Sequence, residues 1–218
     1  MNTKTKSPHN KAQYHHGDLR SSLLKAAQRL LNQHGIEGLS LRKLSEEVGV
    51  SRTAPYHHFK NKNELLCAVA ADGFVKWEEQ LFSSKDFNDE DASQETRFRS
   101  FVQSYVRFAY ENPSLYDLMF GRPIWQQSTF NTSILKEKAY PSFQYVRGII
   151  KNWQSIGLLP PEENNLRLTQ VIWSSLHGIA RLVIDGIYIT EESNNKLSRQ
   201  VDEMCDCAAR LFLQLSKR

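Results

Sequence analysis

Hydrophobic residues recur at helical spacing along most of the chain. Between Asp18 and His34 the apolar side chains fall at offsets 0, 4, 7, 8, 11 and 12 from Leu19, which places them in one stripe of an amphipathic helix. Comparable stripes predict further helices, at about residues 61–81, 98–112, 131–156, 166–187 and 197–215. No stretch alternates apolar and polar residues over the length of a strand, so the pattern predicts an all-α fold.

Two short helices are predicted between residues 40 and 59. Ser40 can cap the first and Gly49 can end it. Ser51 can cap the second, and Pro55 is tolerated there because it falls near the first turn, where few amides have partners to lose. Two short helices joined by a glycine-containing turn of about three residues are typical of a helix-turn-helix.

The pattern also predicts how the chain is organised. We expect a flexible tail over residues 1–15, a compact three-helix head over 16–62 and a connecting helix over 63–82. The polar, acidic stretch from Ser83 to Gln94 interrupts the helical pattern and begins a larger helical body over 83–218.

Charge is distributed unevenly between these parts. Residues 1–62 hold eleven Lys or Arg and four Asp or Glu, although the whole chain of 218 residues carries a net charge of only +4. Six of the seven histidines also precede residue 59. This asymmetry indicates a polyanionic partner for the head, although a solvated basic face would have the same composition.

Several classes of function are disfavoured. The three cysteines are too few and too oddly spaced for a disulfide framework or a zinc site, which favours a reducing compartment, and we expect a cytoplasmic protein. No apolar run approaches the roughly 18 residues of a membrane span, so no membrane partner is expected. Adjacent histidines on a helix diverge by about 100°, so His15-His16 and His57-His58 do not predict a metal site. Since nucleophile elbows, phosphate-binding glycine loops and paired catalytic carboxylates are also missing, we expect neither an enzyme nor a cofactor.

Three segments of the head resemble the TetR/AcrR family of bacterial transcription regulators. They are Leu24-Lys-Ala-Ala-Gln-Arg-Leu-Leu, Gly38-Leu-Ser-Leu-Arg-Lys-Leu-Ser-Glu-Glu-Val-Gly-Val-Ser and Tyr56-His-His-Phe-Lys-Asn-Lys. Tyr14-His-His-Gly-Asp-Leu-Arg20, with Trp173 and His177-Gly178, is similar to the subset of that family whose carboxy-terminal part is called a WHG domain. The resemblance implies a homodimer with a DNA-binding head, an effector-binding body and two final helices that form a four-helix bundle with those of the partner.

The chemistry of DNA recognition then nominates residues in the head. Arg52 can bind guanine O6 and N7 through two hydrogen bonds, and Thr53, Tyr56 and His57 also suit base edges. By resemblance, the residues expected to face bases are Arg42, Arg52, Thr53, Ala54, Tyr56 and His57. Lys62 is expected at phosphate by resemblance, and Ser51 and Lys60 are added on chemistry alone. Phe59 is expected in the core of the head.

Two further sets of residues are nominated in the body. The candidate walls of a pocket for a small apolar or amphipathic effector are aromatic residues and one histidine: Phe101, Tyr105, Phe108, Tyr116, Phe120, Trp125, Trp153, Trp173 and His177. Any one of these rings could instead belong to the core. The candidate dimer interface consists of residues on the last two helices: Ile179, Val183, Leu197, Val201, Met204, Ala208, Leu211 and Leu215.

The function predicted from these observations is that of a ligand-responsive, sequence-specific transcriptional regulator, most simply a repressor. It would act as a homodimer on a palindromic double-stranded operator. A nucleoid or architectural protein that binds DNA without reading its sequence remains the alternative, because it would use the same cationic head.

Overall fold

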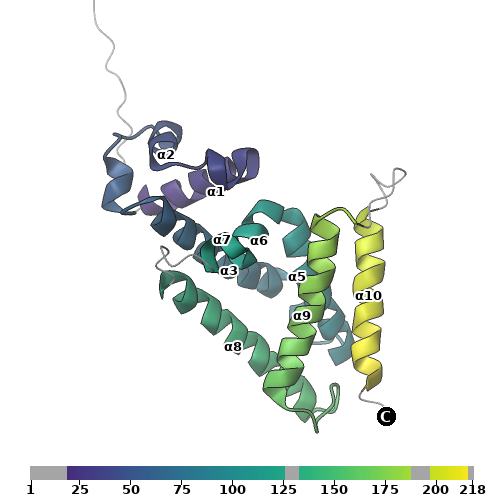
Figure 1. Ribbon diagram of the computed structural model, residues 1–218. Helices are drawn as coiled ribbons and strands as arrows, with labels where there is room; N and C mark the ends of the chain where they lie inside the picture. Colours follow the sequence, from purple (N-terminus) through teal and green to yellow (C-terminus); the bar gives the residue numbers. More distant parts are fainter. Residues whose placement is uncertain (1–18, 126–132, 188–196, 216–218) are drawn as a thin grey trace, which may run out of the picture.

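A computed structural model describes residues 19–125, 133–187 and 197–215 (Figure 1). The residues described are helical or lie in turns, and none of them is in a strand, as the sequence pattern predicts. The amino-terminal tail and the ends of two of the expected helices lie outside the described residues.

The head is built from two helices and a short 3₁₀ segment. Helix α1 spans Leu19–Gly38, α2 spans Leu41–Val48 and the 3₁₀ helix η1 spans Ala54–His57. The side chain of Ser40 accepts a hydrogen bond from the Lys43 amide at 3.2 Å, which caps α2 as expected. Phe59 is 1% exposed and belongs to the core with leucines of α1 and α2, which confirms its expected place.

A long helix, α3, runs from the head into the body (Figure 1). It spans Lys62–Ser83 and begins at Asn61, whose side chain accepts a hydrogen bond from the Glu64 amide at 2.9 Å. Near its middle α3 is bonded to α1, because the Gln28 side chain donates to Asp72 at 2.7 Å. The head is therefore attached to α3 by packing and by polar contacts as well as by the chain itself.

The body is an assembly of helices around the distal part of α3. Its elements are α4 Lys85–Asn88, α5 Gln94–Glu111, α6 Pro113–Phe120, α7 Arg122–Trp125, α8 Ser133–Ser155, α9 Asn165–Ile184 and α10 Leu197–Leu215. Helix α8 packs along α3, whereas α9 and α10 both pack on α5 and lie side by side (Figure 1). Helix α8 lies within the predicted helix at residues 131–156 and contains Pro141, but the single turns α4 and α7 were not predicted.

Candidate DNA-binding surface

The turn after α2 presents the segment that the sequence nominated for base reading. Gly49 adopts a left-handed conformation with φ 73°, and its amide donates to the Glu46 carbonyl, which ends α2. The chain then reverses through Val50, whose amide donates to the Ser45 carbonyl at 3.0 Å. This is the helix, turn and second short helix that the sequence predicts.

The second helix differs from the prediction in its geometry. It is a 3₁₀ helix over Ala54–His57, not an α-helix from Ser51, and its main-chain bonds span three residues, as in Tyr56 N to Thr53 O at 3.1 Å. Pro55 is buried and has no amide to donate, which limits the regular bonding of this turn. The Ser51 hydroxyl also does not cap the helix, because it pairs with the Thr53 hydroxyl at 3.1 Å.

Side chains suited to base edges project from this segment into solvent. Arg52, Thr53, Tyr56 and His57 are all exposed, and Tyr56 is exposed by 55%. Among the described residues, Arg52 has no ion-pair partner, so its guanidinium is free to bind a base. Ala54 is half-buried and can offer only a methyl contact.

Arg42 lies on the preceding helix, α2, and forms an ion pair there. Its Nε donates to the Glu46 carboxylate at 3.2 Å, four residues along α2. An exposed pair of this kind contributes little to stability, so DNA can displace Glu46 at small cost.

The residues nominated for phosphate lie at the ends of the same segment. Ser51 and Lys60 are exposed, and Lys62 is half-buried in the first turn of α3. The Lys60 amide is already bonded to the Glu64 carboxylate at 2.9 Å, so only the ammonium group of Lys60 would be available to a phosphate.

Most of the aromatic residues nominated for an effector pocket pack against one another. One cluster contains Trp77, Tyr105, Tyr116 and Trp173. The ring centroids of Tyr105 and Trp173, for example, are 5.7 Å apart. Phe101 and Trp153 belong to a second cluster around Phe98. The rings of the first cluster lie in the hydrophobic core or pack against it, and none of them lines the three cavities described below.

A buried chain of hydrogen bonds runs through the first cluster. The Tyr105 and Tyr116 hydroxyls are 2.9 Å apart, and the Tyr116 hydroxyl lies 2.6 Å from His177 Nδ1. Burial, reinforced by the nearby Arg181, lowers the pKa of His177 below its usual range. Nδ1 of a neutral imidazole can accept a hydrogen bond from the Tyr116 hydroxyl, so the three side chains can be hydrogen-bonded with His177 uncharged.

Three cavities are described here, and of the nine nominated residues only Trp153 lines one of these three. That cavity, of about 720 Å³, lies between α8 and the segment around α4 and the start of α5. Its apolar walls include Phe87, Tyr145, Ile149 and Trp153, and Gly148 leaves part of the α8 side open, since a Cβ there would meet nothing within 4 Å. Trp125, by contrast, is 40% exposed on α7, away from this cavity.

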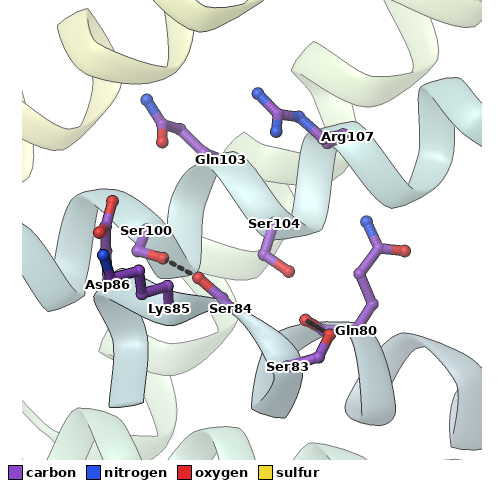
Figure 2. Close-up of a pocket in the computed structure, with 9 residues that line it drawn as sticks. All are labelled: Gln80, Ser83, Ser84, Lys85, Asp86, Ser100, Gln103, Ser104 and Arg107. Atoms are coloured by element: carbon purple, nitrogen blue, oxygen red, sulfur yellow. Dashed lines mark hydrogen bonds between the residues drawn. The ribbon is translucent and has the colours of Figure 1, made fainter. Parts of the chain in front are cut away.

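Sequence reasoning missed a second, polar cavity of about 310 Å³ between the end of α3, α4 and α5 (Figure 2). Ser83, Ser84 and Asp86 come from the stretch interpreted only as an interruption. Ser100 and Ser104 lie one turn apart on α5, and this repeat of small polar residues within an apolar face is the signal from which the site could have been found.

The residues nominated for a dimer interface divide between two faces. Val183 and Val201 are buried within the chain at 2% and 4% exposure, so they pack against the body. Ile179, Met204 and Ala208 are half-buried, and Leu211 is exposed by 59%. The side chains of Leu197 and Leu215 lie outside the described residues.

A basic, exposed helix-turn-helix on an all-helical body defines the chain as a DNA-binding regulator of the helix-turn-helix class. The model of bacterial regulatory proteins of the tetR family matches residues 23–69, and the model of the tetracyclin repressor-like C-terminal domain matches residues 98–206. The second match covers half of the chain and includes Trp173, His177 and Gly178. The chain belongs to the TetR family, whose members are DNA-binding transcriptional repressors and not enzymes.

Curated relatives resemble this chain in the head. The Escherichia coli tetracycline repressor protein class A from transposon 1721 is 48% identical over 50 residues, which are 23% of each chain. The transcriptional repressor AcnR of Corynebacterium diphtheriae is 40% identical over 60 residues, which are 28% of this chain and 32% of that one. The chain thus spans only about a quarter to a third of the length of these relatives.

Solved structures extend the likeness to the whole fold. A Rhodococcus sp. RHA1 protein of unknown function is 30% identical with a TM-score of 0.75, over 94% of this chain and all of that one. The fatty acid degradation regulator FadR from Bacillus halodurans is 16% identical with a TM-score of 0.66, over 90% and 97% of the two chains. In the described part of the chain, no helix has the length and apolarity needed to cross a bilayer.

Proposed function

We propose that this protein is a sequence-specific repressor that binds a palindromic operator as a homodimer and responds to a small apolar or amphipathic effector. The observation that carries the proposal is the exposed segment from Arg52 to His57, which presents base-reading side chains on a folded turn. A protein that only neutralised phosphates would need the positive charge of this segment but not the exposed, unpaired guanidinium beside a hydroxyl, a phenol and an imidazole.

In this proposal the chain is divided as its sequence suggests. Residues 16–62 form the head, 63–82 the connecting helix and 83–218 the body that binds effector and partner. Arg42, Arg52, Thr53, Ala54, Tyr56 and His57 meet bases, and Ser51, Lys60 and Lys62 meet phosphates.

The dimer would form through the outward faces of α9 and α10. On α9 this face carries Val171, Gly178 and Leu182, and a Cβ at Gly178 would meet nothing within 4 Å in the single chain. On α10 it carries Met204 and Leu211, beside a groove in which the Gln200 Oε1 atom is buried with no partner among the described residues. A partner helix would cover the apolar side chains and could supply the missing donor.

The effector would occupy the 720 Å³ cavity beside Trp153, whose volume lies in the range of small-molecule sites. Tyr145 of this cavity also packs on Phe82 at the end of α3, with ring centroids 5.0 Å apart. An occupant that moves Tyr145 therefore acts on the helix that carries the head. The aromatic cluster of Tyr105, Tyr116, Phe120, Trp173 and His177 would support this cavity from the core.

The cavity can be tested by filling it. Gly148→Leu places a side chain in open space on α8 and replaces glycine in a helix, so we expect a fold at least as stable as the wild type. Effectors would be sought by screening apolar and amphipathic compounds for release of the operator in a fluorescence anisotropy assay. An effector that acts equally on wild type and Gly148→Leu would place its site elsewhere.

The operator is tested by mapping bound genomic DNA at base-pair resolution and by sedimentation of the protein with the recovered site. We expect two half-sites about 34–36 Å apart and two chains per site. Monomeric protein on the recovered DNA, or binding without any common sequence, would overturn the proposal and favour the architectural alternative.

A further inference from the structure

The polar cavity of about 310 Å³ lies where the connecting helix ends (Figure 2). Gln80 and Ser83 reach it from α3, Lys85 and Asp86 from α4, and Ser104 from α5. Nine residues line it and all of them are polar, in contrast to the aromatic walls around Trp153. At roughly 30 Å³ for each water molecule, the space holds about ten waters or one small polar molecule.

One side chain of this cavity lacks a partner that its burial demands. Ser104 is 8% exposed, and its Oγ atom is buried with no hydrogen-bond partner among the described residues. Figure 2 shows this hydroxyl directed from α5 toward the end of α3. Its neighbour Ser100 is equally buried but is satisfied, because its hydroxyl lies 2.5 Å from that of Ser84. A buried hydroxyl without a partner is costly, so the orphan at Ser104 indicates a group that is bound there in use.

The charges around the cavity indicate the nature of that group. Lys85 and Arg107 contribute two cations and Asp86 contributes one carboxylate, so the lining carries a net positive charge. Arg107 directs one guanidinium nitrogen to Asp202 at 3.0 Å, which leaves its other donors available. The Ser104 hydroxyl can donate as well, and these donors together suit an oxyanion.

We infer that this cavity is a second ligand site, for a small polar molecule that carries a carboxylate or a phosphate. Its oxyanion would accept hydrogen bonds from Ser104 and Arg107 on α5 and pair with the Lys85 ammonium of α4. Its remaining polar groups would meet Gln80 and Ser83 on α3. Because Arg107 also holds Asp202 of α10, the ligand would join the end of the connecting helix to the α5 and α10 pair. The site differs in ligand class from the apolar cavity and does not depend on it.

The test uses the full chain and two probes, inorganic phosphate and malonate. Each is titrated by calorimetry against chloride at equal ionic strength, and hydrogen exchange of residues 80–88 is followed in parallel. We expect saturable binding of one probe and slower exchange at the end of α3, and the probe that binds tells phosphate from carboxylate recognition. Ser104→Ala and Lys85→Gln should each weaken binding by about tenfold, which is the loss of one hydrogen bond or ion pair to a charged group.

Gly148→Leu serves as the control, because it fills the other cavity and should leave the affinity for the probe unchanged. Ser104→Ala removes an unsatisfied hydroxyl, so its fold should be intact, and exposed Lys85 provides a second variant that cannot disturb packing. The inference is overturned if neither probe binds saturably at millimolar concentration, or if both variants bind as well as the wild type. Loss of binding in Gly148→Leu alone would also refute the inference, because the probe would then be bound in the apolar cavity.

Discussion

Replacing Arg52 with alanine separates sequence reading from charge more sharply than any other change in the head. The side chain is exposed and has no ion-pair partner among the described residues, so we expect the stability of the fold to change by less than about 0.5 kcal/mol. One two-bonded contact to guanine gives about 1–3 kcal/mol of discrimination, and a dimer makes two such contacts. Operator binding should therefore weaken by about 2–6 kcal/mol, or about 30-fold to 10⁴-fold in Kd.

The matched control is Arg29→Ala. Arg29 lies on α1, is also exposed and pairs with Glu47 at 3.4 Å. Its replacement removes the same charge from the head and leaves residues 52–57, which are expected to face the bases, unchanged. Fluorescence anisotropy at several salt concentrations, with operator and scrambled DNA, measures both variants. Arg29→Ala should weaken both DNAs slightly, whereas Arg52→Ala should lose the operator and retain the scrambled DNA. Equal losses on the two DNAs for Arg52→Ala would refute base reading by this residue.

Three further predictions concern the body. Ser104→Ala should raise the free energy of unfolding by up to about 1 kcal/mol in chemical denaturation, whereas Ser45→Ala, which removes a hydroxyl bonded to a carbonyl at 2.7 Å, should lower it by about 1 kcal/mol; equal losses would contradict the orphan at Ser104. Leu211→Glu should dissociate the dimer in sedimentation, at about 1–2 kcal/mol for each chain, while Ile156→Glu, at a similar exposure of 51%, should leave it intact. The pKa of His177 is lowered in the fold, so the unfolded chain binds its proton more readily and this residue's contribution to stability is lost as pH falls below about 6.5. Thermal unfolding between pH 7 and 5 should show that loss in the wild type and a smaller one in His177→Gln; identical pH profiles would exclude His177 as its source.

The positions of the helices could be predicted because the local sequence determines each of them. The glycines at 35 and 49 both adopt positive φ, at 64° and 73°, and the sequence placed helix ends at both. After Gly35 the chain resumes one more helical turn to Gly38, which is followed by the buried Leu39, and this turn was not predicted. The 3₁₀ form of η1 was not predictable, because the burial of Pro55 depends on tertiary packing, in which η1 contacts α2.

The sites could be predicted less well than the helices, for a physical reason. An apolar stripe indicates that one face of a helix is buried, but it does not indicate whether a neighbouring side chain or a ligand covers that face. Tyr116 and Trp173 are covered by rings, whereas Trp153 borders a cavity, and all three have the same spacing pattern. The polar cavity shows the converse, because the repeat of Ser100 and Ser104 marks a polar position on α5 but does not show that tertiary packing buries it.

If the two cavities bind ligands as proposed, the position of α3 provides a route by which an occupant would act on the head. A helix of 22 residues is about 33 Å long, so a tilt of about 10° around its middle displaces each end by about 3 Å. Near the middle α3 lies close to α6, since a Cβ at Gly73 would come within 2.6 Å of Met119 Sδ, and this contact provides a natural pivot. Both cavities contact the far end, through Ser83 in one case and through the contact of Phe82 with Tyr145 in the other. Asp72, next to this pivot, accepts a hydrogen bond from Gln28 of α1, so the head is attached to α3 and would turn with it. Since the half-sites of an operator have a fixed separation, a shift of about 3 Å in each head suffices to favour or oppose binding.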